Sequence, residues 1–352
     1  MQKSKAESFV RPMSVDKIDL SKTCRSTASE KEVKMNAVRT KKKKERRFTR
    51  AAVARDWRKN WKRYLLLLPL LLFFLIFSYL PMGGIVMAFC DYKPKLGIWG
   101  SLINRFVGFA NFQEFFSNFY FWRLIRNTIV LNGLNLLISF PLTILVALLI
   151  NEVGNKLFKK GIQTISYLPY FISSVVVCGI IVDFCKSSGL LGTIVGALTG
   201  KAQNLLGIAD YWRPIYIGSG LWQGLGFGTI LYIAALSGVD KELYDAAKVD
   251  GAGYMKQMWH VTLPGIMPTI IITLILQVGM LMAASYEKTI LMYNEQIYET
   301  ADIIASYVYR RGLLNGDYSF STAVGLFNSI INLFLITITN KISRKYTETS
   351  LF

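Results

Sequence analysis

A polar and charged segment, residues 240–264, lies between two strongly apolar stretches of the chain. Lys241–Val249 contains no helix breaker, and Asp240 before it can accept a hydrogen bond from a free N–H group of a helix N-terminus. One face of this expected helix is small and apolar, with the spacing i, i+3, i+4, i+7 at Leu243, Ala246, Ala247 and Asp250. These residue types suit docking into a groove of another protein, or packing beneath a bilayer, rather than bond-making chemistry.

The second half of the segment continues the same pattern. Gly251 provides the permissive backbone that a sharp turn needs, and Tyr254–Val261 can form a second short helix. Pro264 suits the first turn of the next helix, where its missing N–H is harmless. His260 is the only histidine of the chain, so we interpret it as a contact residue rather than a catalytic base. One histidine and four cysteines without C-x-x-C spacing predict no metal or haem site.

The elements that position this segment are apolar stretches long enough to cross a bilayer, which takes about 20 residues as a helix. The chain of 352 residues is 52% hydrophobic, and its apolar residues are concentrated in blocks. We therefore predict an all-α, polytopic membrane protein. Its six expected transmembrane helices are Tyr64–Phe89, Leu124–Ile150, Ile162–Phe184, Ile215–Val239, Gly265–Met292 and Thr322–Asn340.

The positive charge is concentrated before the first span. Residues 1–63 hold 21 Lys and Arg against 7 Asp and Glu, while the formal net charge of the whole chain is +19. Beside a membrane span such a basic run indicates retention in the cytoplasm and contact with lipid headgroups, although basic runs also occur in nucleic-acid-binding proteins. Six spans return the C-terminus, with Lys341, Arg344 and Lys345, to the cytoplasm, and they place residues 240–262 on the same side.

Three parts of the chain follow from this topology. Residues 1–60 are expected to form a basic, largely disordered cytoplasmic tail that ends in an interfacial helix. Residues 61–345 form the six-helix domain, and residues 346–352 form a short cytoplasmic C-terminal tail.

The polar segment resembles the "EAA" coupling loop of ABC-importer permeases, the loop that binds the ATPase. Asp245-Ala246-Ala247 stands where the family usually has Glu-Ala-Ala, and Asp250-Gly251-Ala252 and Leu263-Pro264 complete the pattern at the family's spacing. Asp245 preserves the charge of the usual glutamate on a shorter arm. From about Trp61 onward the chain resembles the permeases of maltose-type carbohydrate importers. Within that group it resembles the polysaccharide-uptake branch, through Phe89–Gly97 and Val107–Phe112.

The resemblance implies a type I ABC importer permease fold in the plasma membrane of a bacterium. It implies a transport subunit rather than an enzyme, with no cofactor in this chain, because ATP and Mg belong to the partner ATPase. The implied partners are a second homologous permease, two ABC ATPase subunits, an extracellular sugar-binding protein and membrane lipids, with no nucleic acid. The substrate implied is an oligosaccharide or complex sugar.

Polar side chains within the spans are candidates for the pathway, because such groups are costly in a membrane and usually face protein or water. Sugars bind amide and carboxylate groups together with aromatic faces, and Tyr286 beside Glu287 offers both. Other polar groups in the spans are Gln223 and five asparagines, Asn127, Asn132, Asn135, Asn328 and Asn332. For the asparagines the alternative is hydrogen bonding between helices, and Glu287 and Lys288 can instead mark the outer end of the fifth span. We assign substrate contact to Gln277, Tyr286, Glu287 and Asn328.

Three other functions remain open from the sequence. A secondary transporter driven by an ion gradient predicts paired buried charges and internal repeats, which are not evident. A membrane-anchored nucleic-acid- or lipid-binding protein would act through the basic tail. An ABC importer for a non-sugar solute would share the same coupling loop.

Overall fold

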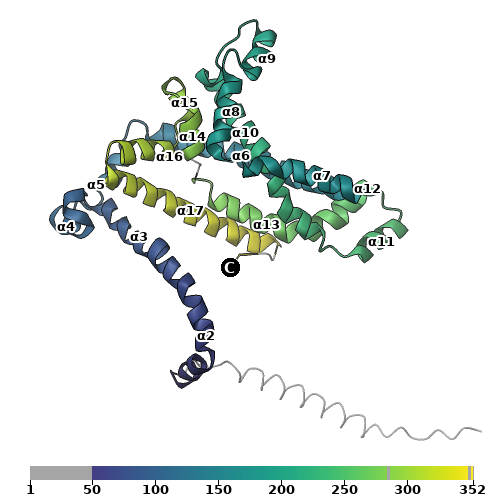
Figure 1. Cartoon of the computed structure of the whole chain (residues 1–352), viewed down its shortest axis with the longest axis horizontal. Helices are drawn as coiled ribbons and strands as arrows, with labels where there is room; N and C mark the ends of the chain where they lie inside the picture. Colours follow the sequence, from purple (N-terminus) through teal and green to yellow (C-terminus); the bar gives the residue numbers. More distant parts are fainter. Residues whose placement is uncertain (1–49, 284–285, 348–349, 352) are drawn as a thin grey trace, which may run out of the picture. The chain divides into compact units, whose positions relative to one another are not determined.

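The computed structural model describes residues 50–283, 286–347 and 350–351, so most of the basic tail, residues 1–49, lies outside the described part (Figure 1). The chain divides into two compact units, Met1–Tyr79 and Leu80–Phe352. Within the described residues every regular element is helical. The all-α prediction is therefore confirmed for this part of the chain.

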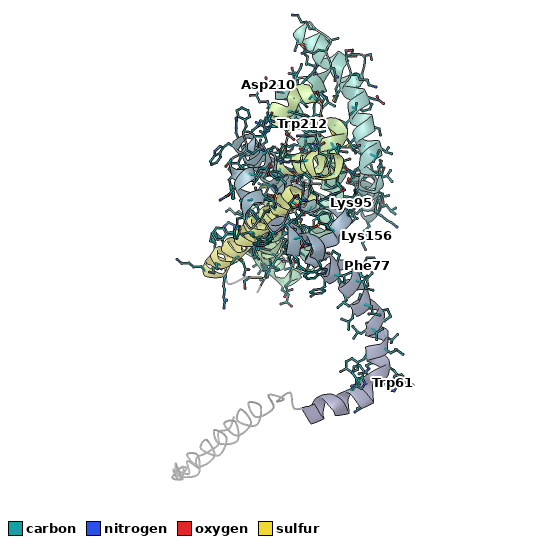
Figure 2. The ribbon with its side chains drawn as sticks, turned by 90° about the vertical axis from the view of Figure 1, so that its left-hand side faces the viewer. Trp61, Phe77, Lys95, Lys156, Asp210 and Trp212 are labelled. Carbon is teal, nitrogen blue, oxygen red and sulfur yellow. The ribbon has the colours of Figure 1, made fainter. Side chains whose placement is uncertain are left out.

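The described part of the first unit is helical throughout. Helix α2 (Arg50–Phe74) leads into a π-helical turn (Leu75–Tyr79), and α2 is kinked at Asn60, which has non-helical backbone angles. The ring of Trp57 stacks on that of Tyr64 with centroids 4.9 Å apart. Trp61 and Phe77, labelled in Figure 2, are both more than half exposed, as are many leucines between them. Such an apolar exterior is expected of a helix whose solvent is lipid.

Six helical segments of the described residues are long and apolar enough to cross a membrane, which confirms the predicted number. They are Lys59–Phe89, Phe121–Glu152, Ser174–Thr199, Ala209–Leu236, Tyr254–Gly279 and Tyr318–Lys345. The first, second, fourth and sixth contain or largely overlap the spans expected from the sequence. The third and fifth differ, because in each the predicted stretch is interrupted.

The second unit is built on two long helices that pack against each other, α6 (Phe121–Glu152) and α10 (Ala209–Leu236). Helix α13 (Leu263–Gly279) packs on α10 and on α17 (Tyr318–Thr347), and these neighbours are visible in Figure 1. At one end of the bundle Leu148, Leu236 and Ile266 form a buried cluster beside the polar segment. A larger buried cluster, around Trp212, lies toward the N-terminal end of α10.

The predicted third span, residues 162–184, is not one continuous helix. Helix α7 (Lys156–Tyr167) ends in a 3-10 turn (Leu168–Phe171), and α8 (Ser174–Cys185) starts anew. Pro169 in this turn has no N–H to continue an α-helix. Gln223 of α10 donates its amide hydrogen to the C=O of Ile172 at 3.1 Å. An amide from a neighbouring helix thus satisfies backbone exposed by the interruption.

The predicted fifth span, residues 265–292, is likewise interrupted. Helix α13 ends at Gly279, and the short helix α14 (Tyr286–Met292) begins the next segment. Asn132 of α6 donates to the C=O of Leu281 at 2.7 Å, and Asn332 of α17 accepts from the N–H of Met282 at 3.0 Å. These two asparagines bond the non-helical backbone from α6 and from α17. Non-helical backbone is tolerated at membrane depth when protein groups satisfy its hydrogen bonds in this way.

We expect Asn132→Leu to lower the free energy of unfolding by about 1 kcal/mol, because the carbonyl of Leu281 loses its amide donor. Asn135→Leu is the matched control. Asn135 lies on the same helix and bonds Ser139 rather than backbone of the interruption. Thermal unfolding of the two purified variants in detergent measures the difference, and equal midpoints would contradict the role of Asn132.

The segments that connect α8 to α10 and α13 to α17 form short helices at the opposite end of the bundle from the polar segment. They are α9 (Leu190–Thr199), α15 (Tyr298–Ala301) and α16 (Ile304–Val308), followed by a π-helical turn (Tyr309–Leu314).

An ion cluster organises these segments around the fully buried Asp302. Its carboxylate pairs with Arg310 at 2.7 Å and with Arg123 of α6 at 3.6 Å. Burial lowers the pKa of Arg310, but its hydrogen bond and charge interaction with Asp302 outweigh this and hold the pKa above its ordinary value. The guanidinium of Arg310 is therefore held charged, and its pairing with Asp302 fixes this end of the bundle.

Candidate functional site

The polar segment folds as the sequence predicts at both ends of its first helix. In α11 (Lys241–Val249) the side chain of Asp240 accepts a hydrogen bond from the N–H of Glu242 at 3.0 Å, which confirms the N-cap. Beyond the C-cap residue Asp250, Gly251 adopts a φ of +71°. This conformation is easy for glycine and unfavourable for residues with a Cβ atom.

Two hydrogen bonds close the end of α11. The N–H of Gly251 bonds the C=O of Lys248 at 3.0 Å, and the N–H of Ala252 bonds the C=O of Ala247 at 2.9 Å. This pair of bonds is a Schellman motif, in which a left-handed glycine satisfies the last carbonyls of a helix. The spacing of the segment thus has a structural reason. Ala246-Ala247 lie near the end of the helix, and Asp250-Gly251-Ala252 form its cap.

The outer face of α11 is largely open. Leu243 is 54% exposed and Val249 is 88% exposed, and Ala246 lies between them on the exposed side. Asp245 is exposed and pairs with Lys248 at 3.2 Å, an interaction within one turn of the same helix. The inner side is held to the bundle through the hydroxyl of Tyr244, which donates to Thr262 at 3.0 Å. An exposed apolar face on an anchored helix is suited to docking into a groove.

The segment after the turn is continuous with a membrane helix. Helix α12 (Tyr254–Gln257) passes through a π-helical turn (Met258–Thr262) directly into α13, where Pro264 occupies the first turn. The sequence predicted a separate helix over 254–261, and the structure instead gives one helical rod from 254 to 279. Leu263 is half-buried and packs on the cluster of Leu148, Leu236 and Ile266. The loop is thus joined to the buried cluster of the bundle by continuous helix.

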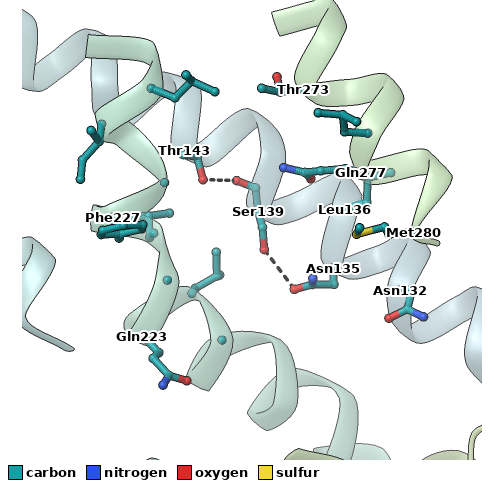
Figure 3. Close-up of a pocket in the computed structure, with 18 of the residues that line it drawn as sticks. Asn132, Asn135, Leu136, Ser139, Thr143, Gln223, Phe227, Thr273, Gln277 and Met280 are labelled. Atoms are coloured by element: carbon teal, nitrogen blue, oxygen red, sulfur yellow. Dashed lines mark hydrogen bonds between the residues drawn. The ribbon is translucent and has the colours of Figure 1, made fainter. Parts of the chain in front are cut away.

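A cleft of about 950 Å³ lies between α6, α10 and α13. Its α6 wall carries a polar stripe, Asn132, Asn135, Ser139 and Thr143, with spacings of three and four residues. The hydroxyl of Ser139 donates to Asn135 at 3.1 Å, and that of Thr143 donates to the C=O of Ser139 at 2.7 Å. Figure 3 shows this stripe along α6, with Gln277 reaching toward it from α13.

The α10 wall of the cleft contributes space and an aromatic face. Glycines recur every four residues along it, at Gly220, Gly224 and Gly228. Because glycine has no side chain, this side of the helix leaves space for the cleft. Phe227 lines the cleft and stacks on Tyr170, with ring planes 2° apart and centroids 3.8 Å apart. Amides, hydroxyls and an aromatic ring around one hollow give the mixture of polar and apolar contacts found in ligand sites.

The structure brings only one of the four assigned substrate residues into this cleft. Gln277 lines it, while Tyr286 and Glu287 are exposed on α14 outside the lining. Asn328 is half-buried on α17 away from the lining, and its side-chain oxygen is buried without a protein hydrogen bond. Their contact with substrate stays a prediction.

Sequence reasoning did not assign the α6 stripe or Lys288, which also lines the cleft. The helical spacing of Asn132, Asn135, Ser139 and Thr143 was the signal available for the stripe. Lys288 had no such signal, because its place at the cleft depends on the interruption between α13 and α14.

Residues 139–347 match the protein family described as the inner membrane component of binding-protein-dependent transport systems, and this range is more than half of the chain. The chain belongs to this family. It is therefore an integral membrane protein and a permease subunit of an ABC importer, not an enzyme. The expected fold and family are both confirmed.

Relatives of this permease cover nearly its whole described length. It is 46% identical over 303 residues to Protein LplB of Bacillus subtilis (strain 168), which covers 86% of this chain and 93% of that protein. It is 43% identical over 290 residues to the polygalacturonan/rhamnogalacturonan transport system permease protein YteP of the same organism, covering 82% and 89%.

The permease also matches a solved structure of a bacterial ABC transporter involved in the import of the acidic polysaccharide alginate. The TM-score is 0.77 and the identity 39%, and the match covers 84% of this chain and 99% of that one. A second structure with the same TM-score holds that transporter in complex with an alginate pentasaccharide-bound periplasmic protein.

Proposed function

We propose that this permease forms half of the membrane pathway for an oligosaccharide in an ATP-driven importer, and that the loop 240–264 couples it to a separate ATPase. The other half of the pathway is a second, homologous permease, and two ATPase subunits dock on the two coupling loops. An extracellular binding protein delivers the sugar. The glycan transport named for YteP and the alginate importer supports the substrate class.

One observation carries this proposal. The helical rod from Tyr254 to Gly279 has its first turn in the exposed loop, and Thr273 and Gln277 near its other end line the cleft. A groove on an ATPase that moves α11 and α12 therefore moves one wall of the cleft. In alternating access the cleft is first open to one side of the membrane and then to the other, and a moving wall is the element that this requires.

The coupling residues have distinct roles in this proposal. Leu243, Ala246 and Val249 form the apolar docking face, and Asp245 lies at its edge, where a basic partner can reach it. Gly251 and Ala252 end the docking helix through the Schellman motif. Leu263 and Pro264 join the loop to α13. The loop then faces the cytoplasm, and both chain termini lie on that side.

Co-purification of the detergent-solubilised permease from its native membrane tests the assembly. We expect to recover a second permease and an ABC ATPase. Recovery of this chain alone or as a homo-oligomer, under conditions that preserve other membrane complexes, would contradict the proposal and favour an ion-driven transporter. Screening the accompanying binding protein against glycans then identifies the substrate class.

A further inference from the structure

Lys288 lies at the edge of the cleft farther from the coupling loop. It belongs to α14, but its ammonium group reaches α10, where it donates to the C=O of Tyr216 at 2.7 Å. The same group lies 4.4 Å from the centroid of the Tyr216 ring. Tyr216 is near the N-terminal end of α10, whereas the coupling helix follows its C-terminal end.

The cleft is shaped to hold this ammonium group. A Cβ atom at Gly220 would lie 3.1 Å from the Lys288 nitrogen, so the glycine leaves the space that the lysine occupies. Tyr216 is 6% exposed and is part of the buried cluster around Trp212, which makes its carbonyl and ring a fixed support. The side chain is therefore positioned by both the backbone and the packing of α10.

The lining of the cleft carries formal charge of one sign, which is positive. Among the described residues that line it, Lys288 carries the only formal charge, and the others are amides, hydroxyls, glycines and apolar groups. Its chain neighbour Glu287 is exposed and does not belong to the lining. A positive charge in a membrane cleft is costly, and an intramembrane ionisable residue usually serves a functional site.

We propose that Lys288 selects for an acidic oligosaccharide by pairing with a sugar carboxylate as it passes through the cleft. This inference rests on the proposed transport function. The ammonium group attracts an anion strongly where the dielectric constant is low, and it offers nothing comparable to a neutral sugar. The amides of Asn135 and Gln277, farther along the cleft, then serve the hydroxyl groups, which acidic and neutral sugars share.

The test compares two substrates and three forms of the permease in the complete transporter, reconstituted in proteoliposomes with its binding protein. The substrates are an oligogalacturonate and its fully methyl-esterified, uncharged form. The forms are wild type, Lys288→Gln and Lys288→Arg. The affinity of the binding protein for each substrate is measured separately, so that a changed ratio of uptake rates between forms reports on the permease alone.

We expect Lys288→Gln to lower uptake of the acid about tenfold relative to the ester, and Lys288→Arg to retain most of the wild-type preference. An unchanged ratio in Lys288→Gln would overturn the inference. Equal loss of both substrates in Lys288→Gln and Lys288→Arg would also overturn it, because the lysine would then be structural. Failure of the proposed function has a different signature, namely no ATP-dependent uptake of either glycan by the wild type.

Discussion

Gly251→Val is expected to reduce ATP-dependent uptake by more than about tenfold while the permease remains folded in the membrane. Valine at a φ of +71° opposes the turn that closes α11. The Schellman bonds to Lys248 and Ala247 then break, and the docking helix loses its fixed relation to the rod that begins at Tyr254. Uptake and ATPase activity of the reconstituted transporter measure the loss.

Gly253→Ala is the matched control, because Gly253 lies in the same turn with a φ of −67° and no atom near a new Cβ. We expect it to transport at nearly the wild-type rate. Gel filtration and thermal unfolding of Gly251→Val show whether the bundle is intact. Normal uptake by Gly251→Val, or equal losses of uptake in both variants, would show that coupling does not require the turn at Gly251.

Gly226→Ala is expected to destabilise the bundle itself by about 3 kcal/mol, a large effect for one methyl group. Gly226 is buried where α10 crosses α7, and a Cβ atom there would collide with the backbone carbonyl of Ser166. A backbone group cannot rotate away as a side chain can, so the two helices must move apart. The separation also displaces the α10 wall of the cleft.

Gly224→Ala on the same helix is the matched control. It adds the same methyl group to α10 without the collision, so it measures the effect of a glycine-to-alanine change on helix stability alone. No atom lies within 4 Å of a Cβ at Gly224, although the residue lines the cleft. We expect wild-type thermal stability for this variant and a clearly lower unfolding midpoint for Gly226→Ala, both measured in detergent. If the two midpoints agree, the close approach of α10 and α7 is not required for stability.

Hydropathy and local rules were sufficient for much of this fold. Six spans, the cap at Asp240 and the turn at Gly251 all depend on composition or on neighbours in sequence, and the structure has each of them. The interruptions of the third and fifth spans depend instead on donors and acceptors from distant helices. Gln223 and Asn332 were visible as polar groups in apolar stretches, but nothing local says that they bond Ile172 and Met282.

The same limitation explains the substrate assignments. A polar side chain in an apolar span can line a pathway or bond a neighbouring helix, and the sequence does not separate the two. Asn132 lines the cleft and also bonds Leu281, so one residue can meet both descriptions. Gln277 reaches the cleft from α13, which is continuous to Gly279, whereas Tyr286 lies on α14 outside the lining.

The interruption between α13 and α14 determines which forces can travel along the fifth span. A continuous helix resists torsion, so a twist applied at Tyr254 reaches Gly279, where α13 ends. Beyond that point the described backbone continues in turns, and the side-chain bonds of Asn132 and Asn332 attach Leu281 and Met282 to α6 and α17. In the proposed coupling mechanism α13 is therefore the part of the span that turns with the loop 240–264, while α14 keeps its orientation, so that one end of the cleft moves and the other stays fixed.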